Sequence, residues 1–156
     1  MISAEQKKKI GQILLENATI SEDSLQQALN QQRQTGRRIG QILLERGQIR
    51  PFQLTQALAQ QAGIEKAVLE EVSISQDIIR MVPAELVSKY NLLPLSRVNG
   101  TLSVAMVDPF DSRAVDDLRL STGCRIRRYL AHHSQIEQAV LKYYGSNVAR
   151  MLQNLA

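Results

Sequence analysis

Residues 9–32 read KIGQILLENATISEDSLQQALNQQ, and residues 38–61 read RIGQILLERGQIRPFQLTQALAQQ. Seven consecutive residues, IGQILLE, occur in both copies 29 positions apart, and a five-residue spacer, RQTGR, joins the copies. Self-similarity at a fixed period of this size indicates that one supersecondary unit is written twice. The chain therefore begins with a tandem repeat, and this repeat decides how the rest is interpreted.

Each copy predicts a helical hairpin. Apolar residues at positions 10, 13 and 14 follow the spacing of one helical face, and the second copy repeats them. Gly47 suits the left-handed residue that ends a helix, and Ala18 holds the same place in copy one, where alanine should cost about 1 kcal/mol relative to glycine. Ser21 suits an N-cap and Pro51 a first helical turn. Two hairpins predict a four-helix bundle over residues 1–64.

Residues 65–145 predict an α+β subdomain. Alternating apolar runs at 92–98 and 101–107 flank Asn99–Gly100, which is a strong hairpin signal. A helix capped by Asp111 or Ser112 follows, then a third strand at 124–131 and a closing helix capped by Ser134 and ended by Gly145. This order predicts a small, mainly antiparallel sheet with helices on one face. We expect residues 146–156 to be a tail or linker to an ATPase core missing from this sequence.

Composition and motifs exclude several classes of protein. The 156 residues carry a net charge of +4, but the basic residues are scattered and no aromatic residue precedes Phe52, so DNA or RNA binding is not expected. No apolar run is long enough for a membrane span, no secretory signal is present, and the single Cys124 fits a cytoplasmic protein. A phosphate-binding loop is absent, and His132–His133 lack further metal ligands. We therefore predict a non-catalytic protein without a metal or a catalytic cofactor.

The repeat itself suggests a binding site. Leu25, Leu29 and Gln32 follow i, i+4, i+7 spacing and share one helix face, and the second copy repeats the pattern with Leu54, Leu58 and Gln61. Gly11 and Gly40 leave room for a ring or phosphate, and Lys9 and Arg38 supply positive charge beside them. These features suit a twofold, anionic purine nucleotide. The alternative is that the leucines form the bundle core and the glycines allow close helix packing.

The repeated pattern R-[LI]-G-x-x-L-x-x-x-G-x-[IL]-x-x-x-x-L-x-x-x-L-x-x-Q resembles the MshEN domain family. Residues 92–118, LLPLSRVNGTLSVAMVDPFDSRAVDDL, resemble the second half of the same N-terminal region in type II secretion and type IV pilus assembly ATPases of the GspE and PilB type. The resemblance implies a regulatory module that binds cyclic di-GMP and couples it to the ATPase. The ligand-binding residues that it implies are Lys9, Ile10, Gly11, Leu14, Leu25, Leu29, Gln32, Arg38, Ile39, Gly40, Leu43, Leu54, Leu58, Gln61 and Asp108.

Copy one departs from the family pattern at two positions. Lys9 replaces arginine and loses the planar fork, and Ala18 replaces glycine. Asp108 is a candidate acceptor for guanine N1 and N2, with an N-cap or turn role as its alternative. The resemblance also implies two protein partners, the ATPase core and an inner-membrane platform protein that would bring the chain to the membrane periphery. The alternative function is a docking scaffold that anchors the secretion ATPase to this platform protein without binding nucleotide.

Overall fold

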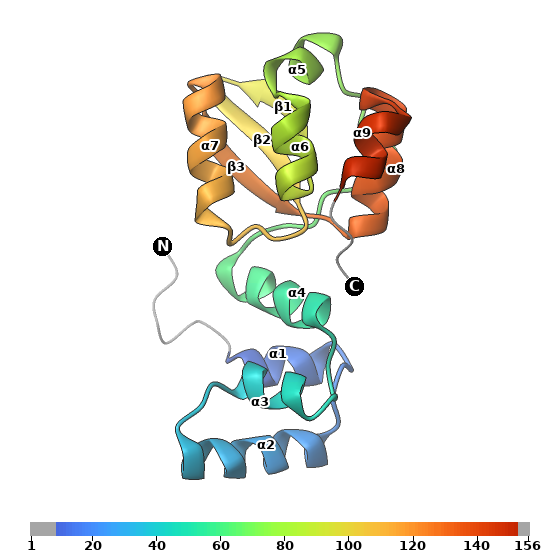
Figure 1. Cartoon of the computed structure of the whole chain (residues 1–156). Coiled ribbons are helices and arrows are strands. Elements are labelled where there is room, and N and C mark those ends of the chain that lie inside the picture. The colour runs from blue at the N-terminus through green and yellow to red at the C-terminus, as the bar shows by residue number, and fades with distance from the viewer. Residues whose placement is uncertain (1–8, 153–156) are drawn as a thin grey trace. The chain divides into compact units, whose positions relative to one another are not determined.

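The chain divides after Gly63 into two units, and each has its own hydrophobic core. The structure is a computed structural model that describes residues 9–152. The first unit contains α1 (Ile10–Glu16), α2 (Glu22–Thr35), α3 (Ile39–Glu45) and α4 (Pro51–Ala62) (Figure 1). The second contains the 3₁₀ turn η2 (Leu69–Glu71), α5 (Gln76–Met81), α6 (Ala84–Tyr90), β1 (Leu92–Val98), β2 (Thr101–Met106), α7 (Ser112–Thr122), β3 (Arg125–Leu130), α8 (His133–Tyr144) and α9 (Ser146–Met151).

The two copies of the repeat keep the same backbone. Helices α1 and α3 have equivalent bounds, and the turns that follow them make equivalent hydrogen bonds, from Ala18 N to Leu15 O and from Gly47 N to Leu44 O, both 3.0 Å long. Ala18 has φ 57° and Gly47 has φ 69°, so both lie in the left-handed region. The predicted strain at Ala18 is therefore present.

Helix packing in the first unit crosses between the copies. α1 packs mainly against α4 and α2 mainly against α3, and Figure 1 shows α1 and α3 between the two longer helices. Side chains at the ends of α1 and α3 reinforce this exchange: Asn17 Nδ2 donates to Gln60 Oε1 at 3.1 Å, and Arg46 donates to Gln27 Oε1 at 2.6 Å. The four helices form one bundle as predicted, and the two copies interlock within it.

The interlocking follows from helix length. α1 and α3 are seven residues long, which is too short for either to be stable without tertiary packing. Ile13 and Leu14 of α1, and Ile42 and Leu43 of α3, are nearly or completely buried in the same core. Each short helix is thus held by residues from both copies.

The second unit confirms the α+β class but has a mixed sheet. β1 and β2 are antiparallel and joined at Asn99–Gly100, where both residues have positive φ, as the turn signal predicted. β2 and β3 are parallel, because the connection between them is a crossover through α7. The expectation of a mainly antiparallel sheet was therefore wrong for this pair. Figure 1 shows α6 and α7 over one face of the sheet, and α8 packs against β1.

The end of the described chain also differs from the prediction. Residues 146–151, which we assigned to a tail, form α9, whose Ala149 is buried together with Leu152 in the core of the second unit. The closing helix α8 begins at His133, two residues earlier than a Ser134 cap predicts. Its N-cap is His132 rather than Ser134, because the His132 ring accepts a hydrogen bond from the Ser134 backbone amide at 3.2 Å.

Candidate functional site

The candidate site is a pocket of about 650 Å³ within the first unit, hereafter the repeat pocket. Its size falls within the range of small-molecule sites, roughly 300–1,000 Å³. All predicted ligand-binding residues except Leu14, Leu43 and Asp108 line it. The lining residues are Lys9, Ile10, Gly11, Gln12, Leu25, Leu29, Gln32, Arg38, Ile39, Gly40, Gln41, Leu54, Leu58 and Gln61.

The lining is twofold in composition. Every position that copy one contributes has its counterpart 29 residues later in copy two, and the two sets differ only where Lys9 stands in place of Arg38. The starts of α1 and α3 supply the basic, isoleucine, glycine and first glutamine positions, and the faces of α2 and α4 supply the two leucines and the second glutamine. Such a lining suits a ligand with two equivalent halves.

The helix glycines allow two helices of one copy to approach closely. A Cβ atom built on Gly11 would lie 2.7 Å from Leu25 Cδ1, and one built on Gly40 would lie 2.7 Å from Leu54 Cδ1. Real Cβ atoms do not approach other atoms so closely, so a larger residue would force the leucine to move. Because both leucines also line the repeat pocket, the glycines set the position of its apolar walls.

The leucine stripes belong to both the pocket and the core. Leu25 is buried within the first core, whereas Leu29, Leu54 and Leu58 are half-buried and keep surface toward the pocket. The leucines therefore have both of the roles that the sequence suggested: they line the pocket and they pack in the core of the bundle. Their apolar surface can exclude water from the face of a bound ring.

Three predicted residues lie elsewhere. Leu14 and Leu43 are completely buried among core residues, because they follow the glycines by three positions and turn toward the interior, so they support the pocket from behind. Asp108 belongs to the second unit, where its carboxylate accepts a hydrogen bond from the Phe110 amide at 3.0 Å. This contact is the turn role that the sequence analysis gave as the alternative for Asp108.

Positive charge at the pocket is available for a ligand. Lys9 and Arg38 are the exposed N-cap residues of α1 and α3, and neither side chain makes a capping hydrogen bond. Within residues 9–152, neither forms an ion pair. Among the described residues, an anionic ligand would therefore meet two cations without having to break an existing ion pair.

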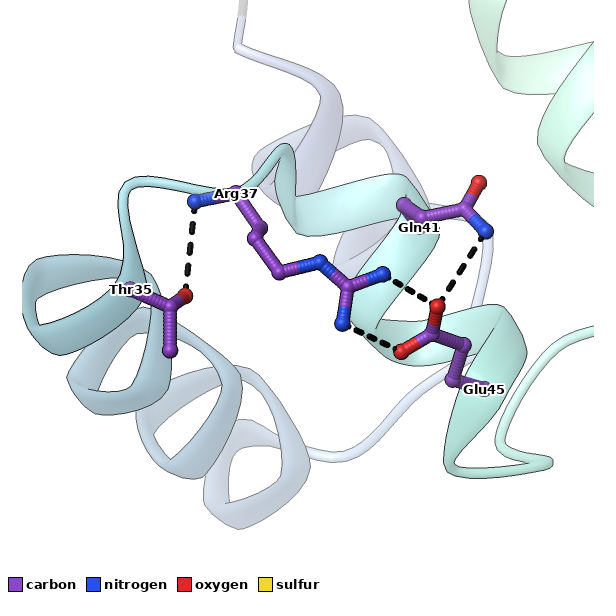
Figure 2. A network of polar contacts seen from close by, with 4 residues as sticks. All are labelled: Thr35, Arg37, Gln41 and Glu45. Carbon is purple, nitrogen blue, oxygen red and sulfur yellow. Dashed lines mark hydrogen bonds and ion pairs between the residues drawn. The ribbon is translucent and has the colours of Figure 1, made fainter.

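The neighbouring basic residue, Arg37, is paired with an acidic residue and does not line the pocket. Its guanidinium forms a two-pronged ion pair with Glu45, and its backbone amide donates to Thr35 Oγ1 at 3.3 Å (Figure 2). The pKa of Glu45 is lowered, first by the hydrogen bond from Arg37 and then by one from Gln41, and the pKa of Arg37 is raised by the same carboxylate. Arg37 thus fastens the spacer to α3, directly before Arg38.

Sequence reasoning missed Gln12 and Gln41, which line the pocket one position after the two glycines. Gln12 Nε2 donates to Glu16 at 3.5 Å and Gln41 Nε2 donates to Glu45 at 3.4 Å, the same contact in both copies. Figure 2 shows the Gln41 oxygen on the side away from Glu45. Both glutamines recur at the 29-residue offset, and that recurrence was the signal for including them.

The described residues show neither a membrane span nor a metal cluster. Among the helices of residues 9–152, none combines the length and the apolar character needed to cross a bilayer. The same residues contain no group of three or more histidine, cysteine, aspartate or glutamate side chains arranged for a metal ion.

Comparison with known proteins identifies relatives of both units. Residues 62–150 match the MshEN domain. The chain is 35% identical over 137 residues to the type IV pilus assembly ATPase PilB of Myxococcus xanthus, covering 88% of this chain and 24% of that protein. It is 29% identical over 63 residues to the type II secretion system protein E of Xanthomonas campestris, covering 40% of this chain and 11% of that protein. The chain thus corresponds to a minor part of each relative.

Solved structures share the fold. The structure of MshE with cdg has a TM-score of 0.63 at 31% identity, and the match covers 88% of this chain and 99% of that chain. The N-terminal domain of XpsE has a TM-score of 0.54 at 17% identity and covers 99% of both chains, which supports the fold alone.

Proposed function

The chain belongs to the MshEN domain family, as its sequence predicted, and on this premise we propose that it is a non-catalytic module that binds cyclic di-GMP. The observation that carries the proposal is the convergence of both repeat copies on one pocket. Cyclic di-GMP is a dianion with two guanosine halves, so each copy would receive one half. The presence of cdg in the structure of MshE, a relative at 31% identity, supports the same ligand here.

Each lining residue type has a role that its chemistry supports. The guanidinium of Arg38 stacks on a guanine or donates to its O6 and N7 acceptors, and Lys9 supplies charge to the other half. Gln32 and Gln61 hydrogen-bond to base edges or phosphates, while Ile10, Ile39 and the four leucines exclude water. Gly11 and Gly40 admit Leu25 and Leu54 against the helix backbone and thereby set the apolar walls that the ligand would meet.

Gln12 and Gln41 would select guanine by its N–H donors. Their amide nitrogens donate to Glu16 and Glu45, which leaves the amide oxygens as acceptors. Guanine carries N–H donors at N1 and N2, and these are the groups that such an acceptor would recognise. Asp108 remains a further proposed acceptor.

The module would act on a larger machine. The relatives are a pilus assembly ATPase and a secretion system protein, and this chain corresponds to 24% and 11% of their lengths. We propose that ligand binding is passed to the core of a type II secretion or type IV pilus assembly ATPase in the cytoplasm, and that a platform protein of the inner membrane is a further partner. No catalytic step and no catalytic cofactor is assigned to the chain itself.

Calorimetric titration of the 156-residue chain with cyclic di-GMP tests the proposal, with GTP and cyclic di-AMP as competitors of different shape and base. We expect saturable binding of cyclic di-GMP alone, and its loss in Arg38→Ala. Arg119→Ala is the matched control, because this exposed arginine of α7 lies outside the repeat pocket. A flat titration of correctly folded protein would overturn the proposal and favour the docking scaffold.

A further inference from the structure

The outer edge of β3 has backbone groups that the sheet does not use. β3 is the last strand in the order β1–β2–β3, so only one of its edges pairs with another strand. Arg125 N donates to Gly100 O at 2.9 Å and Ala131 N to Met106 O at 3.0 Å, which places the odd-numbered residues toward β2. Backbone groups of successive residues in a strand point to opposite edges, so those of Ile126 and Arg128 point outward.

A short segment already pairs with one end of this edge. Leu130 N donates to Glu65 O at 2.9 Å and Leu130 O accepts from Ala67 N at 2.8 Å, which forms a single parallel bridge between Lys66 and Leu130. The segment does not extend further, because the chain before it is the end of α4. Among residues 9–152, no backbone hydrogen bond reaches the outward-facing groups of Ile126 or Arg128.

The side chains along the open edge alternate in character. Arg125 and Arg127 are exposed on one face, and neither forms an ion pair within residues 9–152. The Arg127 guanidinium lies 5.1 Å from the Tyr129 ring centroid, which orients it along that face. Ile126 is half-buried on the opposite face, whereas Arg128 donates to Pro109 O at 2.8 Å.

Arginines on an edge strand also protect it against aggregation, and this is the simpler explanation. Protection against aggregation requires only that charged side chains lie somewhere on the edge strand, in no particular arrangement. Here two cations that form no ion pair with the described part of the chain share one face at alternate positions, and an apolar side chain lies between them on the other face. Cross-strand neighbours approach within about 5 Å between Cβ atoms, so a strand laid beside β3 would bring its own alternating side chains next to these.

We propose that the edge of β3 at Arg125–Arg128 binds an extended acidic segment of a partner protein by strand addition. The backbone groups of Ile126 and Arg128 would pair with the segment, carboxylates at alternate positions would face Arg125 and Arg127, and an aliphatic residue between them would contact Ile126. This site lies in the second unit and does not depend on the repeat pocket or its ligand.

Fluorescence anisotropy of a labelled peptide, Ser-Glu-Val-Glu-Val-Glu-Ser, titrated with the 156-residue chain tests the proposal. We expect saturable binding that weakens at least tenfold when Arg125→Glu and Arg127→Glu are combined. The double variant Arg113→Glu and Arg119→Glu makes the same change of charge on α7 and should leave binding within about twofold of the unmodified chain.

Backbone pairing is tested separately with two N-methylated peptides. One carries methyl groups on the odd-numbered amides and the other on the even-numbered amides, so only one of them keeps the donors that face β3. We expect one peptide to bind and the other to lose binding, because a contact made by side chains alone would not distinguish them. Equal binding of both, or no saturable binding at millimolar peptide, would overturn the proposal. So would arginine-dependent binding of a single-stranded oligonucleotide, or self-association through this edge, in place of peptide binding.

Discussion

The turns that follow α1 and α3 offer a matched test of backbone strain. Ala18 and Gly47 occupy the same place in the two copies, with φ of 57° and 69° and equivalent hydrogen bonds. Both are exposed, and a Cβ built on Gly47 meets no atom within 4 Å. Exchanging alanine and glycine at these positions therefore changes the backbone preference and almost nothing else.

The magnitude follows from two opposing contributions. An L-residue in the left-handed region is strained by roughly 1–2 kcal/mol, and glycine relieves this strain. Glycine also gives the unfolded chain more freedom, which offsets about 0.4–1 kcal/mol of the gain. The net expectation is that Ala18→Gly stabilises the first unit by about 1 kcal/mol and that Gly47→Ala destabilises it by a similar amount.

Thermal unfolding followed by circular dichroism measures the effect. For a unit of this size, 1 kcal/mol corresponds to a Tm shift of about 4–8 °C. Ala18→Gly should raise the Tm of the first unit, Gly47→Ala should lower it, and the double exchange should restore the original value because the sites share no contact. If Ala18→Gly lowered the Tm, the left-handed backbone at position 18 would be refuted.

Three further predictions concern the first unit, two of them its repeat pocket. Lys9→Arg should strengthen cyclic di-GMP binding roughly fivefold in calorimetry, because it restores a planar stacking group worth about 1 kcal/mol; unchanged affinity would show that position 9 acts only as a charge. Gly40→Ala should weaken binding several-fold without unfolding the chain, since Leu54 must move into the pocket; wild-type affinity would contradict the packing described here. Arg37→Ala should raise the pKa of the Glu45 carboxyl toward its ordinary value in an NMR titration. The contribution of this pair to stability is present above the unfolded pKa and lost as pH falls through the lowered folded pKa, and the variant should lack that acid-dependent loss.

Much of the fold was predictable because local signals agreed with tertiary structure. The strand at 92–98 matches β1 in both bounds, Ser21 caps α2 as expected, and Asp111, one of the two predicted candidates, caps α7. These features depend on short-range chemistry: a turn that only certain residues adopt, or a side chain that accepts from a nearby amide. The same signals occur in both copies of the repeat, so each copy supported the helix positions predicted for the other.

Features that depend on long-range packing were not predictable in the same way. The direction of β3 is set by the crossover through α7, and an alternating strand pattern does not reveal the direction of its neighbour. The exchange of helix partners between the copies is equally invisible to periodicity, because identical faces fit either partner. Residues 146–151 lack a strong apolar pattern, yet Ala149 reaches the core of the second unit.

The glycines of the repeat link folding and binding through the same atoms. Each glycine admits a leucine side chain, Leu25 in copy one and Leu54 in copy two, and that leucine then contributes to the pocket wall. A substitution that separates the helices therefore also moves the wall, and a ligand that fills the pocket presses on the residues that hold the helices together. Because both leucines also pack in the shared core of the interlocked copies, ligand in one half of the pocket acts on contacts made by both copies. Because the same leucines form the pocket wall and the shared core, a twofold ligand would reduce the mobility of all four helices of the first unit.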